Sequence, residues 1–154
     1  MRFKIFLYTL ASASLFILPL NNAFAGNLFN YNETGKMQLL GNYLEIFIDN
    51  SGSTNLSDII AKGVFVKNDN AIPSLPVSKN TVWIKVSLSN MDADNIFLML
   101  SYPNISRIDV YKDSLGQLKY LASDGNSLPQ VNHKSSNPNY IFNLLLARGH
   151  RETL

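Results

Sequence analysis

The side chains that could carry out catalysis are few in this sequence. His133 and His150 are the two histidines, and both lie in polar stretches that offer no partner to orient a general base or complete a metal site. Cysteine is absent, which excludes disulfides, thiolate nucleophiles and cysteine-ligated metals. We find no phosphate-binding loop, nucleophile elbow or metal-ligand spacing. The sequence therefore predicts a protein that is not an enzyme and that holds neither a metal nor another cofactor.

The acidic residues permit two interpretations. Asp92 and Asp94 form an Asp-x-Asp pair in a predicted loop. Such loops bind calcium through oxygen ligands, although the same residues more often serve as turn formers, and we favour the turn. Glu45, Asp49 and Asp58 form no recognisable glycosidase pair, because such a pair depends on a separation that spacing along the chain does not provide.

Aromatic residues are the remaining candidates for a functional site. Their apolar faces and polar tips suit stacking against a sugar ring. Packing in the interior is the commoner role of large aromatic side chains, so both roles stay open. The candidate ligand-binding residues are Trp83, Tyr102, Tyr111 and Tyr120.

The elements that would position these residues are short. Apolar runs of strand length alternate with turn residues, a pattern typical of an all-β sandwich or barrel. Residues 56–62 predict one short helix, capped by Asn55 or Ser57 and ended by Gly63. Residues 26–40 are polar and predict a loose N-terminal arm. The other predicted strands cover residues 44–48, 64–66, 96–101, 108–111, 118–122 and 140–147.

The clearest strand signal covers residues 81–89. Apolar and polar side chains alternate there without interruption, which predicts one continuous strand with one face in the core. The residues on the predicted core face are Val82, Ile84, Val86 and Leu88.

The last seven residues predict a hairpin. Residues 148–152 resemble a turn, and Thr153 and Leu154 resemble the start of a strand that returns along residues 140–147. A domain that stopped there would leave an unpaired edge, which proteins normally avoid. We therefore expect the chain to be a fragment of a longer protein.

The first 25 residues have the pattern of a secretory signal peptide. Arg2 and Lys4 precede an apolar run over residues 5–20, and Ala23-Phe24-Ala25 fits the cleavage rule. The alternative is an uncleaved anchor, but the run is shorter than the ~20 residues that span a bilayer. Removing the leader leaves 11 basic and 11 acidic residues, so the mature chain has no basic field for nucleic acid.

Several segments, in their order and spacing, resemble one family. Residues 82–85 are similar to its tryptophan-centred strand, Asn90 to the residue that ends that strand, and residues 98–103 to its next strand and Tyr-Pro corner. Residues 108–111, Gly116, the Gly125-Asn126 turn with Pro129, and residues 142–144 resemble its later parts. The family is the second type of extracellular sensory domain of bacterial seven-transmembrane receptors with diverse intracellular signalling modules.

The resemblance implies a jelly-roll-like antiparallel β-sandwich over residues 41–154, akin to carbohydrate-binding modules and located in the periplasm. It implies a small-molecule ligand, with sugars as one class, and a seven-helix membrane domain as the partner in the intact parent, with membrane tethering there. Fold alone does not establish a ligand. The alternative function is a free-standing secreted carbohydrate-binding or adhesion module.

The leader makes a direct prediction about processing. Expressed in a Gram-negative host, the protein should accumulate in the periplasm with Gly26 at its N-terminus, because the basic start, apolar run and Ala-x-Ala site occur in the order that signal peptidase requires. N-terminal sequencing of the periplasmic fraction tests this. Recovery of Met1 from a membrane pellet would contradict it.

Overall fold

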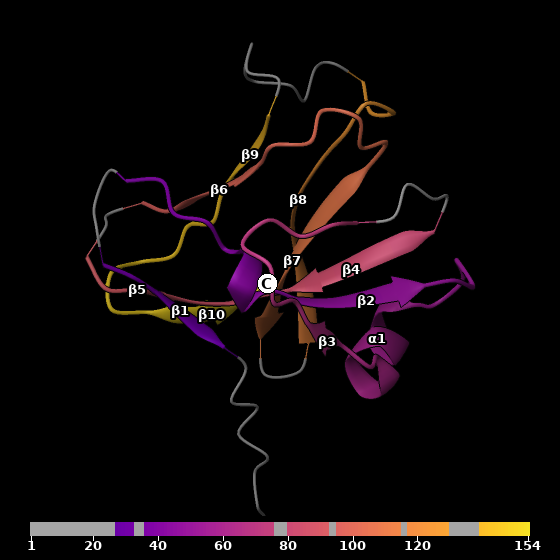
Figure 1. Cartoon of the computed structure of the whole chain (residues 1–154), viewed down its shortest axis with the longest axis horizontal. Helices are drawn as coiled ribbons and strands as arrows, with labels where there is room; N and C mark the ends of the chain where they lie inside the picture. Colours follow the sequence, from indigo (N-terminus) through magenta and orange to yellow (C-terminus); the bar gives the residue numbers. More distant parts are fainter. Residues whose placement is uncertain (1–26, 33–35, 76–79, 93–94, 115–116, 130–138) are drawn as a thin grey trace, which may run out of the picture.

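In the part of the chain that the structure describes, the strands form three sheets and are accompanied by one short α-helix (Figure 1). The structure is a computed structural model, and it describes residues 27–32, 36–75, 80–92, 95–114, 117–129 and 139–154. The predicted signal peptide and both His133 and Asp94 lie outside these residues. The all-β fold class is confirmed. In the described part, no helix is long and apolar enough to cross a membrane.

The largest sheet has five strands in the order β1-β5-β10-β7-β8. Its strands are β1 (Leu28–Tyr31), β5 (Ser87–Asn90), β7 (Ile108–Ser114), β8 (Gln117–Asp124) and β10 (Arg151–Thr153). β10 is antiparallel to both of its neighbours, β5 and β7. β1 runs parallel to β5, whereas the other strand pairs of this sheet are antiparallel.

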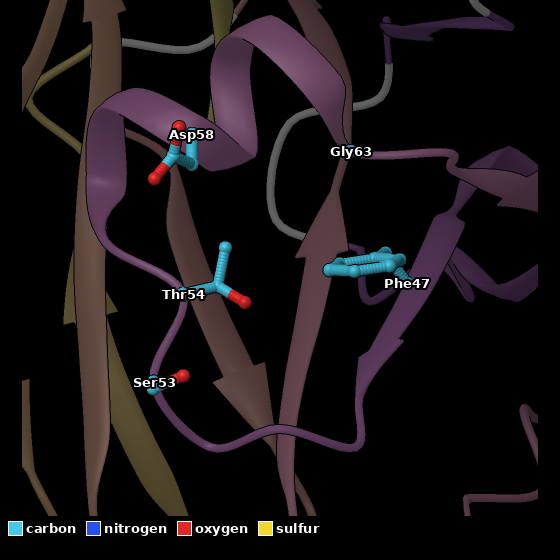
Figure 2. Close-up of a pocket in the computed structure, with 5 residues that line it drawn as sticks. All are labelled: Phe47, Ser53, Thr54, Asp58 and Gly63. Carbon is cyan, nitrogen blue, oxygen red and sulfur yellow. The ribbon is translucent and has the colours of Figure 1, made fainter.

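The second sheet has three strands in the order β3-β2-β4. They are β2 (Glu45–Asp49), β3 (Val66–Lys67) and β4 (Thr81–Lys85), and a 3-10 turn, η1 (Gly41–Tyr43), leads into β2. The helix α1 (Leu56–Lys62) connects β2 to β3 and lies beside this sheet (Figures 1 and 2). The side chain of Asn55 accepts a hydrogen bond from the backbone of Asp58, and Gly63 follows the last turn, as predicted.

The third sheet is a pair, β6 (Phe97–Leu100) and β9 (Tyr140–Asn143), joined antiparallel. Residues 96–101 are almost all apolar, a composition typical of a fully buried strand. Within the described part β6 pairs with β9 alone, and Phe97 is 58% exposed. The run is apolar on both faces, yet only Ile96, Leu98 and Leu100 of it pack against the core.

The core lies between the sheets and draws on every layer. Its buried apolar side chains are Phe29, Leu44, Val86, Leu88, Val110, Tyr140, Phe142, Leu144 and Leu146. Burial alternates from Tyr140 to Leu146 although the ladder of β9 stops at Asn143. Leu145 has φ of 50°, an uncommon value for a residue with a side chain, which explains why the strand is shorter than predicted.

Residues 81–89 do not form the single strand that the alternation predicts. The ladder breaks at Val86, so β4 belongs to the three-stranded sheet and β5 to the five-stranded one. Val86 and Leu88 are buried as expected, whereas Ile84 is 36% exposed. The expectation of a buried Ile84 is therefore wrong, because the period of two fixes which side chains share a face and not what covers that face.

Two further expectations need correction. Residues 26–40 are not wholly a loose arm, because β1 pairs with β5 and Phe29 is buried in the core. The C-terminal segment does not return along residues 140–147. β10 instead lies between β5 and β7, and the backbone groups of Leu154 and Val86 exchange two hydrogen bonds of 2.9 and 3.1 Å.

The difference between Leu88 and Ile84 can be tested by truncation. Replacing Leu88 with Ala should lower the free energy of unfolding by about 2–5 kcal/mol, because it opens a cavity in the core. Replacing Ile84 with Ala should cost less than about 1 kcal/mol, because that side chain is only partly covered. Chemical denaturation of both variants measures the two values, and equal losses would contradict the break at Val86.

Candidate functional site

Two of the four candidate aromatic residues meet on the five-stranded sheet. Tyr111 on β7 is paired with Tyr120 on β8, and their ring centroids lie 5.9 Å apart in an edge-to-face arrangement. Tyr111 is half-buried and Tyr120 is 59% exposed. A half-buried and an exposed ring in contact give an aromatic surface open to solvent.

A β-bulge in β8 creates this arrangement. The register passes from Val110 paired with Ala122 to Tyr111 paired with Tyr120, so Leu121 is the extra residue on β8. Leu121 and Ala122 both pack against the core. In a regular strand Tyr120 would share the core face of Ala122. The bulge instead turns it outward beside Tyr111, a role that bulges often have near functional sites.

Polar side chains extend the aromatic pair into a connected cluster. Arg107 donates from Nε and Nη2 to both carboxylate oxygens of Asp109, at 2.8 to 3.1 Å. Asp109 is opposite Ser123 in the ladder, and the hydroxyl of Ser123 accepts a hydrogen bond of 2.8 Å from Tyr120. We call Arg107, Asp109, Tyr111, Tyr120 and Ser123 the tyrosine surface.

The charges of this cluster change the pKa values of its members. The hydrogen bond and charge of Asp109 raise the pKa of Arg107, and interactions with Tyr111 and Tyr120 add to the increase. Burial raises the pKa of Tyr111, with a further contribution from Asp109. Tyr111 is therefore neutral at physiological pH, and its hydroxyl group can donate and accept hydrogen bonds.

The other two candidates lie elsewhere. Trp83 is on β4, opposite Phe47 of β2, in the three-stranded sheet. Its indole Nε1 is buried and has no hydrogen-bond acceptor within the described residues. Tyr102 is exposed in the loop after β6. The structure therefore joins Tyr111 to Tyr120 and places Trp83 in a different sheet.

A hollow of about 310 Å³ lies on the side of the three-stranded sheet that α1 borders. It is lined by Phe47, Ser53, Thr54, Asp58 and Gly63. Figure 2 shows the oxygen atoms of Ser53 and Thr54 directed to the side on which the Phe47 ring lies. This hollow offers one aromatic ring and two hydroxyl groups to a solute.

Asp49 fixes the loop that carries Ser53 and Thr54. One carboxylate oxygen accepts from the hydroxyl and backbone N–H of Ser51 and from the N–H of Gly52, and the other accepts from the N–H of Thr54. Hydrogen bonds from Ser51 and then from Thr54 lower the pKa of Asp49 to about 2 from an ordinary value of 3.8. Asp49 is thus a structural residue of the loop.

A second hollow is apolar and is lined mainly by Ile46, Ile48, Val64 and Val66. No group of three or more acidic or histidine side chains in the described residues could hold a metal ion. Asp92 instead forms an ion pair with Arg148 and also accepts a hydrogen bond from it through the backbone. Arg107, Asp109 and Ser123 were missed at the level of sequence, although opposite charges two apart in a strand were a visible signal.

Comparison with known proteins gives one finding. Residues 41–154 match the family model described as 7TMR-DISM extracellular 2. The chain belongs to this family. Its members are extracellular sensory domains of seven-transmembrane receptors, so the resemblance inferred from the sequence is confirmed. No curated protein and no solved structure matches the chain significantly.

The lowered pKa of Asp49 predicts how stability depends on acid. The folded pKa lies below the unfolded one, so this carboxylate stabilises the fold above about pH 4, and the contribution is lost as the pH falls toward 2. Asp49→Asn should remove that part of the pH dependence. Melting temperatures from pH 6 to pH 2 for wild type, Asp49→Asn and the exposed control Asp69→Asn test this. Parallel curves for wild type and Asp49→Asn would contradict it.

Proposed function

We propose that this 7TMR-DISM extracellular 2 domain binds a small hydroxyl-bearing ligand, with sugars as the leading class, on the tyrosine surface. The family membership supports a sensory role outside the cytoplasm. The observation that carries the ligand assignment is the Tyr111–Tyr120 pair, turned outward by the bulge at Leu121. Aromatic rings stack on the C–H faces of sugars while nearby hydroxyl and charged groups bind their hydroxyls.

The location and partner follow from the same proposal. The predicted leader directs export, and in a Gram-negative host the domain acts in the periplasm. Its partner in the intact parent is a seven-helix membrane domain, and this partner transmits the signal when the sensory domain binds its ligand. The given chain is then a fragment of that receptor. The alternative, a free-standing secreted carbohydrate-binding or adhesion module, uses the same surface without a membrane partner.

The tyrosine surface is favoured over Trp83 for two reasons. The indole nitrogen of Trp83 is buried, so a ligand at the surface does not reach it without rearrangement. Tyr120, in contrast, exposes 59% of its surface and its hydroxyl already takes part in a hydrogen bond with Ser123. A ligand hydroxyl can therefore join an existing polar network. Tyr102 remains a candidate for a neighbouring contact.

Alanine substitution tests the proposal. An array of neutral oligosaccharides is first screened with wild type, and affinity for any bound glycan is measured by calorimetry. Tyr111→Ala and Tyr120→Ala should each weaken binding by up to about tenfold, because a ring contact contributes about 0.5–1.5 kcal/mol. Phe97→Ala is the matched control, because Phe97 is exposed to the same extent in another sheet. Equal effects of all three substitutions, or binding that no tyrosine substitution weakens, would overturn the assignment.

A further inference from the structure

The charges of the tyrosine surface are paired with each other. Arg107 is 60% exposed and Asp109 24% exposed, and the guanidinium holds the carboxylate through two nitrogen atoms. Such a bidentate pair has a defined geometry and neutralises both charges locally. Together with the two tyrosine side chains, the five residues of the tyrosine surface present hydrogen-bonding groups without an unpaired cation.

The Arg107 guanidinium has more N–H donors than its bonds to Asp109 use. A guanidinium carries five N–H donors, and the bonds to Asp109 come from Nε and Nη2 only. Nη1 is not among the atoms that bind Asp109, and Arg107 is 60% exposed. A ligand with adjacent hydroxyl groups can accept from the guanidinium and donate to the carboxylate at once.

The pairing sets a barrier to acidic ligands. An acidic ligand that approached Arg107 would have to displace Asp109 from the guanidinium.

From this arrangement we infer that the Arg107–Asp109 pair makes the tyrosine surface selective for neutral, hydroxyl-rich ligands over their acidic counterparts. The inference rests on the proposed function and adds a specificity-determining pair to it. Asp109 is the residue that sets the selectivity, because it prevents Arg107 from recruiting a ligand carboxylate. Arg107 in turn prevents Asp109 from recruiting a cation.

The test uses one sugar in two charge states. The probes are trigalacturonate and its fully methyl-esterified form, which share ring, linkage and length. The full exported chain is titrated with each by calorimetry as wild type, Asp109→Asn, Arg107→Gln and the double variant. Thermal melts establish that each variant is folded.

The expected results form a cycle. Wild type should prefer the ester. Asp109→Asn should shift the ratio of affinities toward the acid by about threefold to fivefold, the upper range for exposed ion pairs, because Arg107 is then unpaired. Arg107→Gln should shift the ratio the other way, and the double variant should return toward wild type.

The opposing results separate this inference from the proposed function. If wild type binds the ester through Tyr111 and Tyr120 but Asp109→Asn leaves the ratio unchanged, the selectivity is wrong and the proposed function stands. A wild-type preference for the acid would likewise overturn the selectivity alone. If no variant binds either probe, or if Tyr111→Ala and Tyr120→Ala leave the affinity unchanged, the proposed function and the inference fail together.

Discussion

The break in the strand ladder at Val86 is the constraint on which the arrangement of the sheets depends. On one side of it the chain pairs with β2, and on the other side it pairs with β1 and β10. Val86 exchanges its backbone hydrogen bonds with Leu154 instead of with either ladder, and its side chain is buried in the core. One extended segment can therefore serve two sheets because its backbone groups are satisfied where it crosses between them.

This crossing places the functional candidates on separate sheets. Trp83 comes before the break and stays with β2 and α1, while the strands after it assemble around β10 and reach β7 and β8. Asn90, which ends β5, is fully buried and donates its side-chain amide to the carbonyl of Leu146. The backbone of Asn90 also binds Gly149 and His150. The turn before β10 is thus held by the same segment that crosses the sheets.

Local signals in the sequence predicted local structure well. The helix over residues 56–62 was predicted with its caps, because Asn55 and Gly63 act within one turn of the helix ends. The alternation over residues 81–89 correctly put Val86 and Leu88 in the core. It could not show that Ile84 belongs to another sheet, because the period of two is unchanged when a strand leaves one ladder for the next.

For the candidate site too, the sequence predicted the residue types but not the contact between them. Tyr111 and Tyr120 were identified from their chemistry, yet their contact depends on the extra residue Leu121, and the sequence carries no local mark of that bulge. Regular pairing would have sent Tyr120 to the core side. The parallel pairing of β1 was equally hidden, since Phe29 and Tyr31 form a short strand signal among asparagines and the partner strand lies more than fifty residues away.

Polar residues that support the fold differ from those of the tyrosine surface in where their hydrogen bonds lie. The former are bonded inside the protein, and the latter are exposed to water. The hydroxyl of Tyr140 has three acceptors within hydrogen-bond distance, the carbonyls of Pro103 and Ile105 and the side-chain oxygen of Asn126, and its proton ties the β6–β9 pair to the loops before β7 and after β8. Asp49 and Asn90 are also buried, and their side chains form hydrogen bonds inside the protein. Removing such a partner leaves a buried polar group unpaired and costs stability. Arg107 and Tyr120 are instead exposed, and water can replace any bond that they lose. These two residues are therefore free to exchange water for a ligand without a cost to the fold.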